Sequence, residues 1–134
     1  MTNETQLMVE TELPISFKCA DGTGIPKGSF VKLTESMTAI ITSGQKDMIA
    51  GITAEEKIAN DGKVTVPVYM GGIFKVVAGA TIAIGAALMM DATVNRVETA
   101  STVTGAAGVG YALEAPSADG QTFIMRLQIG NSTS

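Results

Sequence analysis

The sequence predicts an all-β fold, a small β-barrel or β-tulip-like domain of short strands with an extended N-terminal arm. Short apolar segments alternate with polar residues along the chain, and turns containing Gly, Asp or Asn separate them at short intervals. Hydrophobic residues make up 46% of the 134 residues, but aromatic residues only 4%, with no Trp. We therefore expect one domain with a core of small aliphatic and methionine side chains.

The chain is expected to begin with an arm. Residues 1–14 are mostly polar and show no clear period, which is typical of an extended segment. Ile15, Phe17 and Cys19 then alternate with polar residues and predict the first half-buried strand. Cys19 is the single cysteine, so no disulfide can form within the chain, and we expect a buried structural thiol. The turn at 21–24 follows.

The remaining strands are expected at segments separated by turns. They are predicted around 31–33, 39–42, 49–52, 64–70, 73–77, 86–90, 94–98, 108–113 and 122–129. Thr53–Glu56 has the spacing of a capping box and predicts a single helical turn up to Ala59. The predicted organisation is an arm at 1–14, a single β-domain at 15–130 and a flexible tail at 131–134.

Two parts of the chain repeat a similar pattern. The first copy begins at Ile25–Gly28, and the second begins at Ile82–Gly85. In each copy a glycine-centred strand follows, at Gly51 or Gly110, and an Asp-Gly turn comes later. This pattern predicts two similar β-units packed as one barrel, arising either from duplication or from the shared composition of β-turns.

The residue types needed for most catalysis are missing. The chain has no His, which removes the usual general base, the imidazole ligand of metals and every Ser-His or Cys-His pair. Glu55-Glu56 is the only adjacent acidic pair, and neighbours on a helical turn do not face each other. The glycine-rich segments 22–28 and 105–110 match neither a P-loop nor a dinucleotide fingerprint. We expect no enzyme, no catalytic residue, no cofactor and no metal.

Charge and hydropathy exclude two further classes of partner. The net charge is −4, and the nine Lys and Arg are scattered singly, so nucleic-acid binding is not expected. The apolar stretch 76–90 is too short for a membrane span, and the N-terminus lacks the basic region of a signal peptide. We expect no membrane partner.

Several short motifs together resemble the capsid decoration, or head cement, proteins of tailed phages. In order along the chain they are Ile25–Leu33, Asp47–Ile52, Asp61–Val66, Ala78–Ile82, Gly108–Leu113 and the closing strand Thr122–Leu127. The resemblance spans most of residues 15–130, and the order and spacing of the motifs are more specific than any single one.

This resemblance implies a virion structural protein made in the host cytoplasm and located on the outer capsid surface. It further implies a homotrimer that binds the major capsid protein, cements neighbouring subunits and stabilises the mature head. Two alternatives stay open: another virion β-protein of the tail tube or tail tip, and a small barrel that binds a ligand or saccharide. The second usually needs Trp or Tyr in its pocket, and the chain has only Tyr69 and Tyr111.

The N-terminal arm is the candidate capsid-binding site. Our hypothesis is strand addition, in which Leu7, Met8 and Val9, with Leu13 beyond them, pair with an exposed sheet edge of a capsid subunit. The alternative is a disordered terminus without a binding role.

Overall fold

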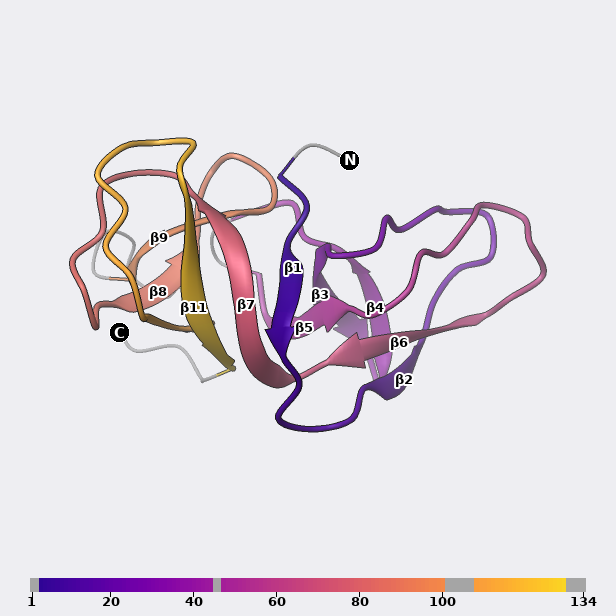
Figure 1. The fold of residues 1–134 in the computed structure, drawn as a ribbon. Coiled ribbons are helices and arrows are strands. Elements are labelled where there is room, and N and C mark those ends of the chain that lie inside the picture. Colours follow the sequence, from indigo (N-terminus) through magenta and orange to yellow (C-terminus); the bar gives the residue numbers. More distant parts are fainter. Residues whose placement is uncertain (1–2, 45–46, 101–107, 130–134) are drawn as a thin grey trace.

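The computed structural model describes residues 3–44, 47–100 and 108–129, and its regular elements are all strands (Figure 1). The strands are β1 (Gln6–Val9), β2 (Ile15–Lys18), β3 (Phe30–Glu35), β4 (Thr38–Ile41), β5 (Ile49–Thr53), β6 (Thr65–Tyr69), β7 (Gly71–Ala78), β8 (Ala87–Met90), β9 (Arg96–Thr99), β10 (Gly110–Ala112) and β11 (Thr122–Gln128). The all-β prediction is confirmed. Over these ranges we find no helix that is long and apolar enough to cross a membrane.

The strands form two barrels with the same connectivity. In the first barrel the order is β2-β4-β3-β5-β6, and a parallel pair of β2 with β4 and an antiparallel pair of β6 with β2 close the ring. In the second barrel the order is β7-β11-β10-β8-β9, and a parallel pair of β7 with β9 closes it. Figure 1 shows the second barrel on the left, the first on the right and β1 crossing between them.

The prediction that both units pack as one barrel is therefore wrong, although the repeat itself is real in the structure. Each unit closes into a ring of its own, because its first strand pairs with both its third and its fifth strand. The repeated glycines occupy equivalent positions: Gly51 and Gly110 have φ of 156° and 146°. At either one, an added Cβ would collide with a backbone carbonyl of the neighbouring strand, that of Tyr69 or Arg126.

One apolar cluster fills each barrel, but the second cluster crosses the junction. The first barrel encloses Phe17, Cys19, Ile25, Val31, Ala39, Ala50, Val66 and Val68. The second barrel encloses side chains that include Phe74, Val76, Leu88, Met90, Phe123, Met125 and Leu127. Phe30, Ile49 and Ile52 belong to strands of the first barrel but pack into this second cluster. The two barrels are thus joined through buried apolar surface, which is the main stabilising contribution at such a junction.

Two local predictions have different outcomes. Cys19 is buried, as expected, and burial raises the pKa of its thiol. The helical turn predicted for 53–59 is wrong: Thr53 ends β5, and Lys57 forms a backbone bridge with Ile25. The Thr53 hydroxyl accepts a hydrogen bond from Ser29 N and donates one to the Pro26 carbonyl, so it cannot cap a helix. The predicted tail at 131–134 and glycine-rich residues 105–107 lie outside the described residues.

Candidate functional site

The N-terminal arm contains a strand that joins the second barrel. β1 pairs antiparallel with β7 in the register Gln6 with Lys75 and Leu7 with Phe74, and the register shifts before Val9 pairs with Ile73. The shift leaves Met8 as a bulge. Among the described strands, β1 lies at the edge of its sheet, and β7 pairs with one of its two backbone edges.

The predicted binding residues lie along this edge and the segment that follows it. Leu7, Met8 and Val9 are exposed, although all three are large apolar side chains. Leu13, in the connection between β1 and β2, is 76% exposed. The structure thus brings the first three together on one edge strand and places Leu13 beyond it. Exposed apolar side chains on an unpaired edge favour association with another chain.

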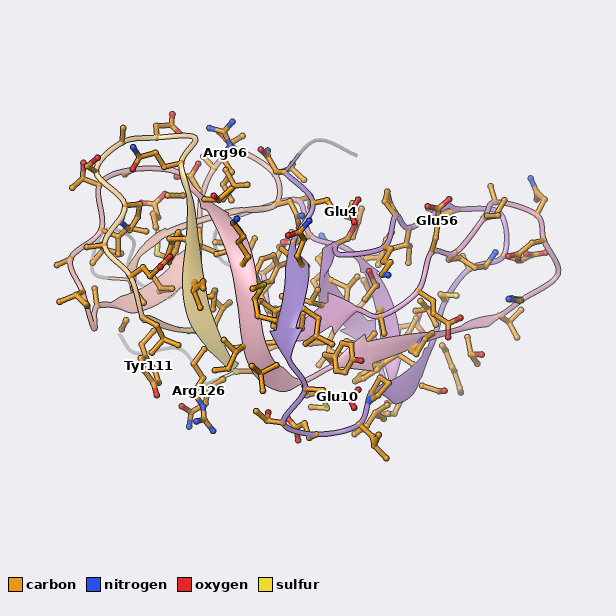
Figure 2. The ribbon with its side chains drawn as sticks, in the orientation of Figure 1. Glu4, Glu10, Glu56, Arg96, Tyr111 and Arg126 are labelled. Atoms are coloured by element: carbon orange, nitrogen blue, oxygen red, sulfur yellow. The ribbon has the colours of Figure 1, made fainter. Side chains whose placement is uncertain are left out.

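Polar contacts fix both ends of this strand. Before β1, Thr5 is buried, and its N–H and its hydroxyl both donate to the carbonyl of Gly28 in the first barrel. After β1, the Tyr69 hydroxyl of β6 donates to the carboxylate of Glu10 at 2.7 Å, and this hydrogen bond raises the pKa of Tyr69. Figure 2 labels Glu4 and Glu10 near the two ends of β1. The arm therefore spans the junction and holds both barrels.

Asn95 connects the arm to the two barrels. It lies fully buried in the turn between β8 and β9 with φ of 65°, a conformation that Asn tolerates better than most residues. Its side-chain carbonyl accepts from Phe30 N at 2.7 Å, and its amide donates to the carbonyls of Asn3 and Gly28. Sequence reasoning missed this residue. The only signal was a polar residue of turn-forming type, and a turn does not show what its side chain will contact.

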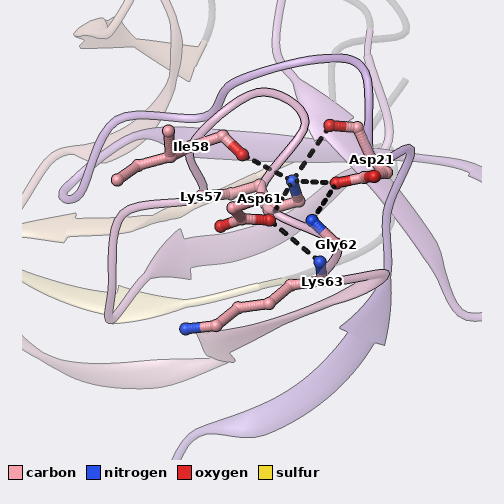
Figure 3. A network of polar contacts seen from close by, with 6 residues as sticks. All are labelled: Asp21, Lys57, Ile58, Asp61, Gly62 and Lys63. Atoms are coloured by element: carbon pink, nitrogen blue, oxygen red, sulfur yellow. Dashed lines mark hydrogen bonds and ion pairs between the residues drawn. The ribbon is translucent and has the colours of Figure 1, made fainter.

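A second buried polar group stabilises the loops of the first barrel. Lys57 is 2% exposed, and its Nζ contacts carboxylate oxygens of Asp61 at 2.7 Å and Asp21 at 3.0 Å (Figure 3). It also donates to the carbonyls of Asp21 and Ile58. Burial alone would lower the pKa of Lys57, but the hydrogen bonds to both carboxylates outweigh it, and the pKa is raised. The hydrogen bond from Lys57 holds the pKa of Asp61 at about 2.

This cluster is structural. All of its donors are matched, and the described residues contain no group of carboxylate and cysteine side chains that could hold a metal ion. The sequence had identified Asp61-Gly62 as a turn, but nothing in it indicated that a lysine would be buried there.

An apolar groove opens at one end of the first barrel. It has a volume of about 600 Å³, and Ile15, Leu33, Met37, Met48 and Met70 line it with apolar side chains. All five side chains are more than a third exposed. The alternation of Ile15 with Phe17 and Cys19 predicts a buried side chain at Ile15, so sequence reasoning missed the groove. Whether a barrel end is covered depends on neighbouring units and not on strand periodicity.

A family model described as phage cement protein matches residues 9–127. The chain belongs to the phage cement protein family. The resemblance noted in the sequence is thereby confirmed, and membership of a structural phage family argues against an enzyme. The match begins at Val9, so most of β1 lies before it.

A solved structure shares the fold of this cement protein. It is the head fiber gp8.5 N base of bacteriophage phi29, with 14% sequence identity and a TM-score of 0.52 over 95% of this chain and 100% of that chain. At this identity the likeness concerns the fold. No curated protein matches the chain.

Proposed function

We propose that this cement protein binds the outer surface of a phage head and links neighbouring major capsid protein subunits, thereby stabilising the mature head. The observation that supports it most directly is the edge strand β1, which displays Leu7, Met8 and Val9 to solvent in a member of this family. The functional form we propose is a homotrimer.

The proposed contact is strand addition. The backbone edge of β1 that faces away from β7 is available to pair with an edge strand of a capsid subunit, and its exposed side chains add apolar contact. Leu13 extends this contact toward the start of β2.

The anchoring of β1 suits a cementing role. A load on β1 is passed to the second barrel through the β7 ladder and to the first barrel through Thr5 and Glu10. Since both barrels and the arm also meet at Asn95, the load is shared by the whole molecule. Three such arms in a trimer would act together through effective concentration, so modest contacts add up to firm attachment.

The binding test uses full-length protein and undecorated heads in a cosedimentation titration. Removing the arm is a poor test, because truncation also deletes the buried Thr5 and its contacts with Gly28. The double variant Met8→Glu, Val9→Glu leaves those contacts in place and puts charge on the proposed interface. Ile58→Glu is the matched control, since Ile58 is similarly exposed but lies in the Lys57 loop.

We expect the double variant to bind heads at least about tenfold more weakly, and the control to bind as the wild type does. Unchanged affinity of the double variant would exclude β1 as the binding site. The same titration against purified tails separates this proposal from a tail role: the wild type should bind heads and not tails. Heads saturated with the wild type should also release their DNA at a higher temperature than bare heads.

A further inference from the structure

The junction between the two barrels defines two complementary surfaces. One is the end of the second barrel, formed by Phe74, Met90 and Leu127 together with the turn at Asn95. The other is the outward face of the first barrel, formed by Phe30, Ile49 and Ile52. Because the barrels have the same connectivity, each surface has a counterpart on the other barrel.

The counterpart of the buried barrel end is the groove of the first barrel. Phe74 of the second barrel and Ile15 of the first occupy equivalent positions. Phe74 is paired with Met125 and Ile15 with Val68. Met125 and Val68 are themselves equivalent, because they lie against the repeated glycines Gly110 and Gly51. Phe74 is 2% exposed, whereas Ile15 is 46% exposed. In the same way Met90 corresponds to Leu33, Leu127 to Met70 and Asn95 to Met37, and each groove residue is exposed.

The counterpart of the outward face lies on the second barrel. Phe30 and Ile52 are opposite each other in β3 and β5, and the equivalent pair in β8 and β10 is Ala87 and Tyr111. Figure 2 shows Tyr111 pointing outward beside Arg126.

Two large apolar side chains border this second face. They are Ile84, which is 72% exposed, and Leu113. Their counterparts, Lys27 and Ala54, lie beside Phe74 at the junction. The chain therefore has one groove and one apolar face that are both without cover among the described residues.

We propose that two copies of this protein associate head to tail, with the Ile84, Ala87, Tyr111 and Leu113 face of one copy in the groove of the next. The arrangement repeats the junction inside each chain. It is also continuous with that junction, since Ile49 lines the groove and packs into the second core.

The sizes of the side chains fit this arrangement. Within the chain, the Phe30 N–H donates to the short side chain of Asn95, and the Phe30 ring packs into the second core. In the contact between copies, Met37 takes the position of Asn95 and Ala87 takes the position of Phe30. The larger side chain is then on the groove and the smaller one on the opposing face. Three methionines line the groove, and their flexible side chains adapt to an irregular partner surface.

A head-to-tail contact of this kind is heterologous, so it either closes into a ring or continues as a filament. The number of copies, three, rests on the homotrimer in the proposed function; the contact itself does not. Three copies would form a closed ring of alternating first and second barrels.

The test uses purified protein without heads, so that its failure is distinct from a failure of head binding. Sedimentation of the wild type at submillimolar concentration should show a closed oligomer. Met37→Glu should weaken association at least about tenfold, and so should Tyr111→Ala, whereas Ile58→Glu should not. Thermal unfolding checks that each variant is folded.

Cysteine cross-linking then fixes which surfaces meet. Asn95 contacts Phe30, so we expect Met37→Cys in one copy to lie near Ala87→Cys in the next. Mixing the two variants under mild oxidation should give a disulfide-linked dimer that neither variant gives alone; Cys19 is buried and stays unreactive. A wild type that sediments as a monomer overturns the proposal. A Met37→Cys variant that links to itself overturns it too, because that result shows a groove-to-groove contact.

Discussion

The two barrels share one connectivity but differ at equivalent ends. The end of the second barrel is buried under Phe30, Ile49 and Ile52 of the first. The equivalent end of the first barrel is a groove open to solvent. A second difference lies in the loops. In the first barrel the carbonyl of Lys57 accepts a hydrogen bond from Ile25 N. At the equivalent position of the second barrel, the carbonyl of Pro116 accepts one from Ile82 N. Only the first barrel therefore carries the buried lysine cluster there.

This comparison shows that strand pattern and burial are separate properties of a β-unit. The same alternation produces a closed ladder in both copies, yet equivalent side chains are buried in one and exposed in the other. What covers a barrel end is decided by neighbouring surfaces. A buried end contributes to the stability of the chain, and an open end is available for association.

The largest effect is expected where both barrels depend on glycine. Gly51→Ala and Gly110→Ala each place a Cβ against a backbone carbonyl at a φ that side chains rarely adopt. Each should cost more than about 3 kcal/mol, measured as the free energy of unfolding in urea. Gly62→Ala is the control: its φ is 85°, but no atom lies within 4 Å of the added Cβ. Its cost should be about 1 kcal/mol. Equal losses at Gly51 and Gly62 would show that the close approach has no role.

The second prediction compares the two barrel ends directly. Phe74→Ala removes a buried ring that packs on Tyr69 and should cost about 4 kcal/mol. Ile15→Ala, at the equivalent position in the open groove, should cost less than about 1 kcal/mol. Urea denaturation in dilute monomeric protein measures both. A similar cost at the two sites would contradict the difference between the ends.

The third prediction concerns the turn residues Asn95 and Met37. Asn95→Ala leaves Phe30 N and the carbonyl of Asn3 without these partners and should cost about 3 kcal/mol. Met37→Ala should change the free energy of unfolding of the monomer by less than about 0.5 kcal/mol. Asn95→Asp keeps an acceptor for Phe30 N but sets a buried carboxylate oxygen against the carbonyls of Asn3 and Gly28, so it should cost at least as much as Asn95→Ala at neutral pH.

The smallest expected effect is a loss of stability at low pH that originates in the first barrel. The hydrogen bond from Lys57 lowers the pKa of Asp61 from 3.8 to about 2 in the folded state. Its contribution to stability is therefore fully present above the ordinary pKa and is lost as pH falls through about 2. Urea midpoints over this range should fall more for the wild type than for Asp61→Asn, which lacks the contribution at every pH. Parallel pH profiles of the two proteins would exclude Asp61 as the source.

The strands could be predicted because alternating apolar residues and Gly-containing turns encode a ladder locally. The strand around Val66 and Val68 and the closing strand with Phe123 and Met125 are examples, and their burial follows the predicted alternation. The arm could be predicted only as a segment without a period. Its pairing with β7 is a long-range contact that nothing in residues 6–9 specifies.

The number of barrels and the polar contacts at the junction could not be predicted for the same reason. The parallel pairs that close the barrels are short: one residue pair, Lys18 with Thr38, in the first barrel and two residue pairs between β7 and β9 in the second. The Thr53 side chain fits a capping box in sequence, yet Ser29 and Pro26 bind it at the end of a strand. Asn95 and Lys57 acquire their roles only when distant segments meet.

An image reconstruction of heads with and without the added protein tests the cementing role most directly. We expect extra density on the outside of the shell, over the junctions between capsid subunits, with β1 beside a capsid strand. Density confined to a single subunit, or no density on heads, would contradict it.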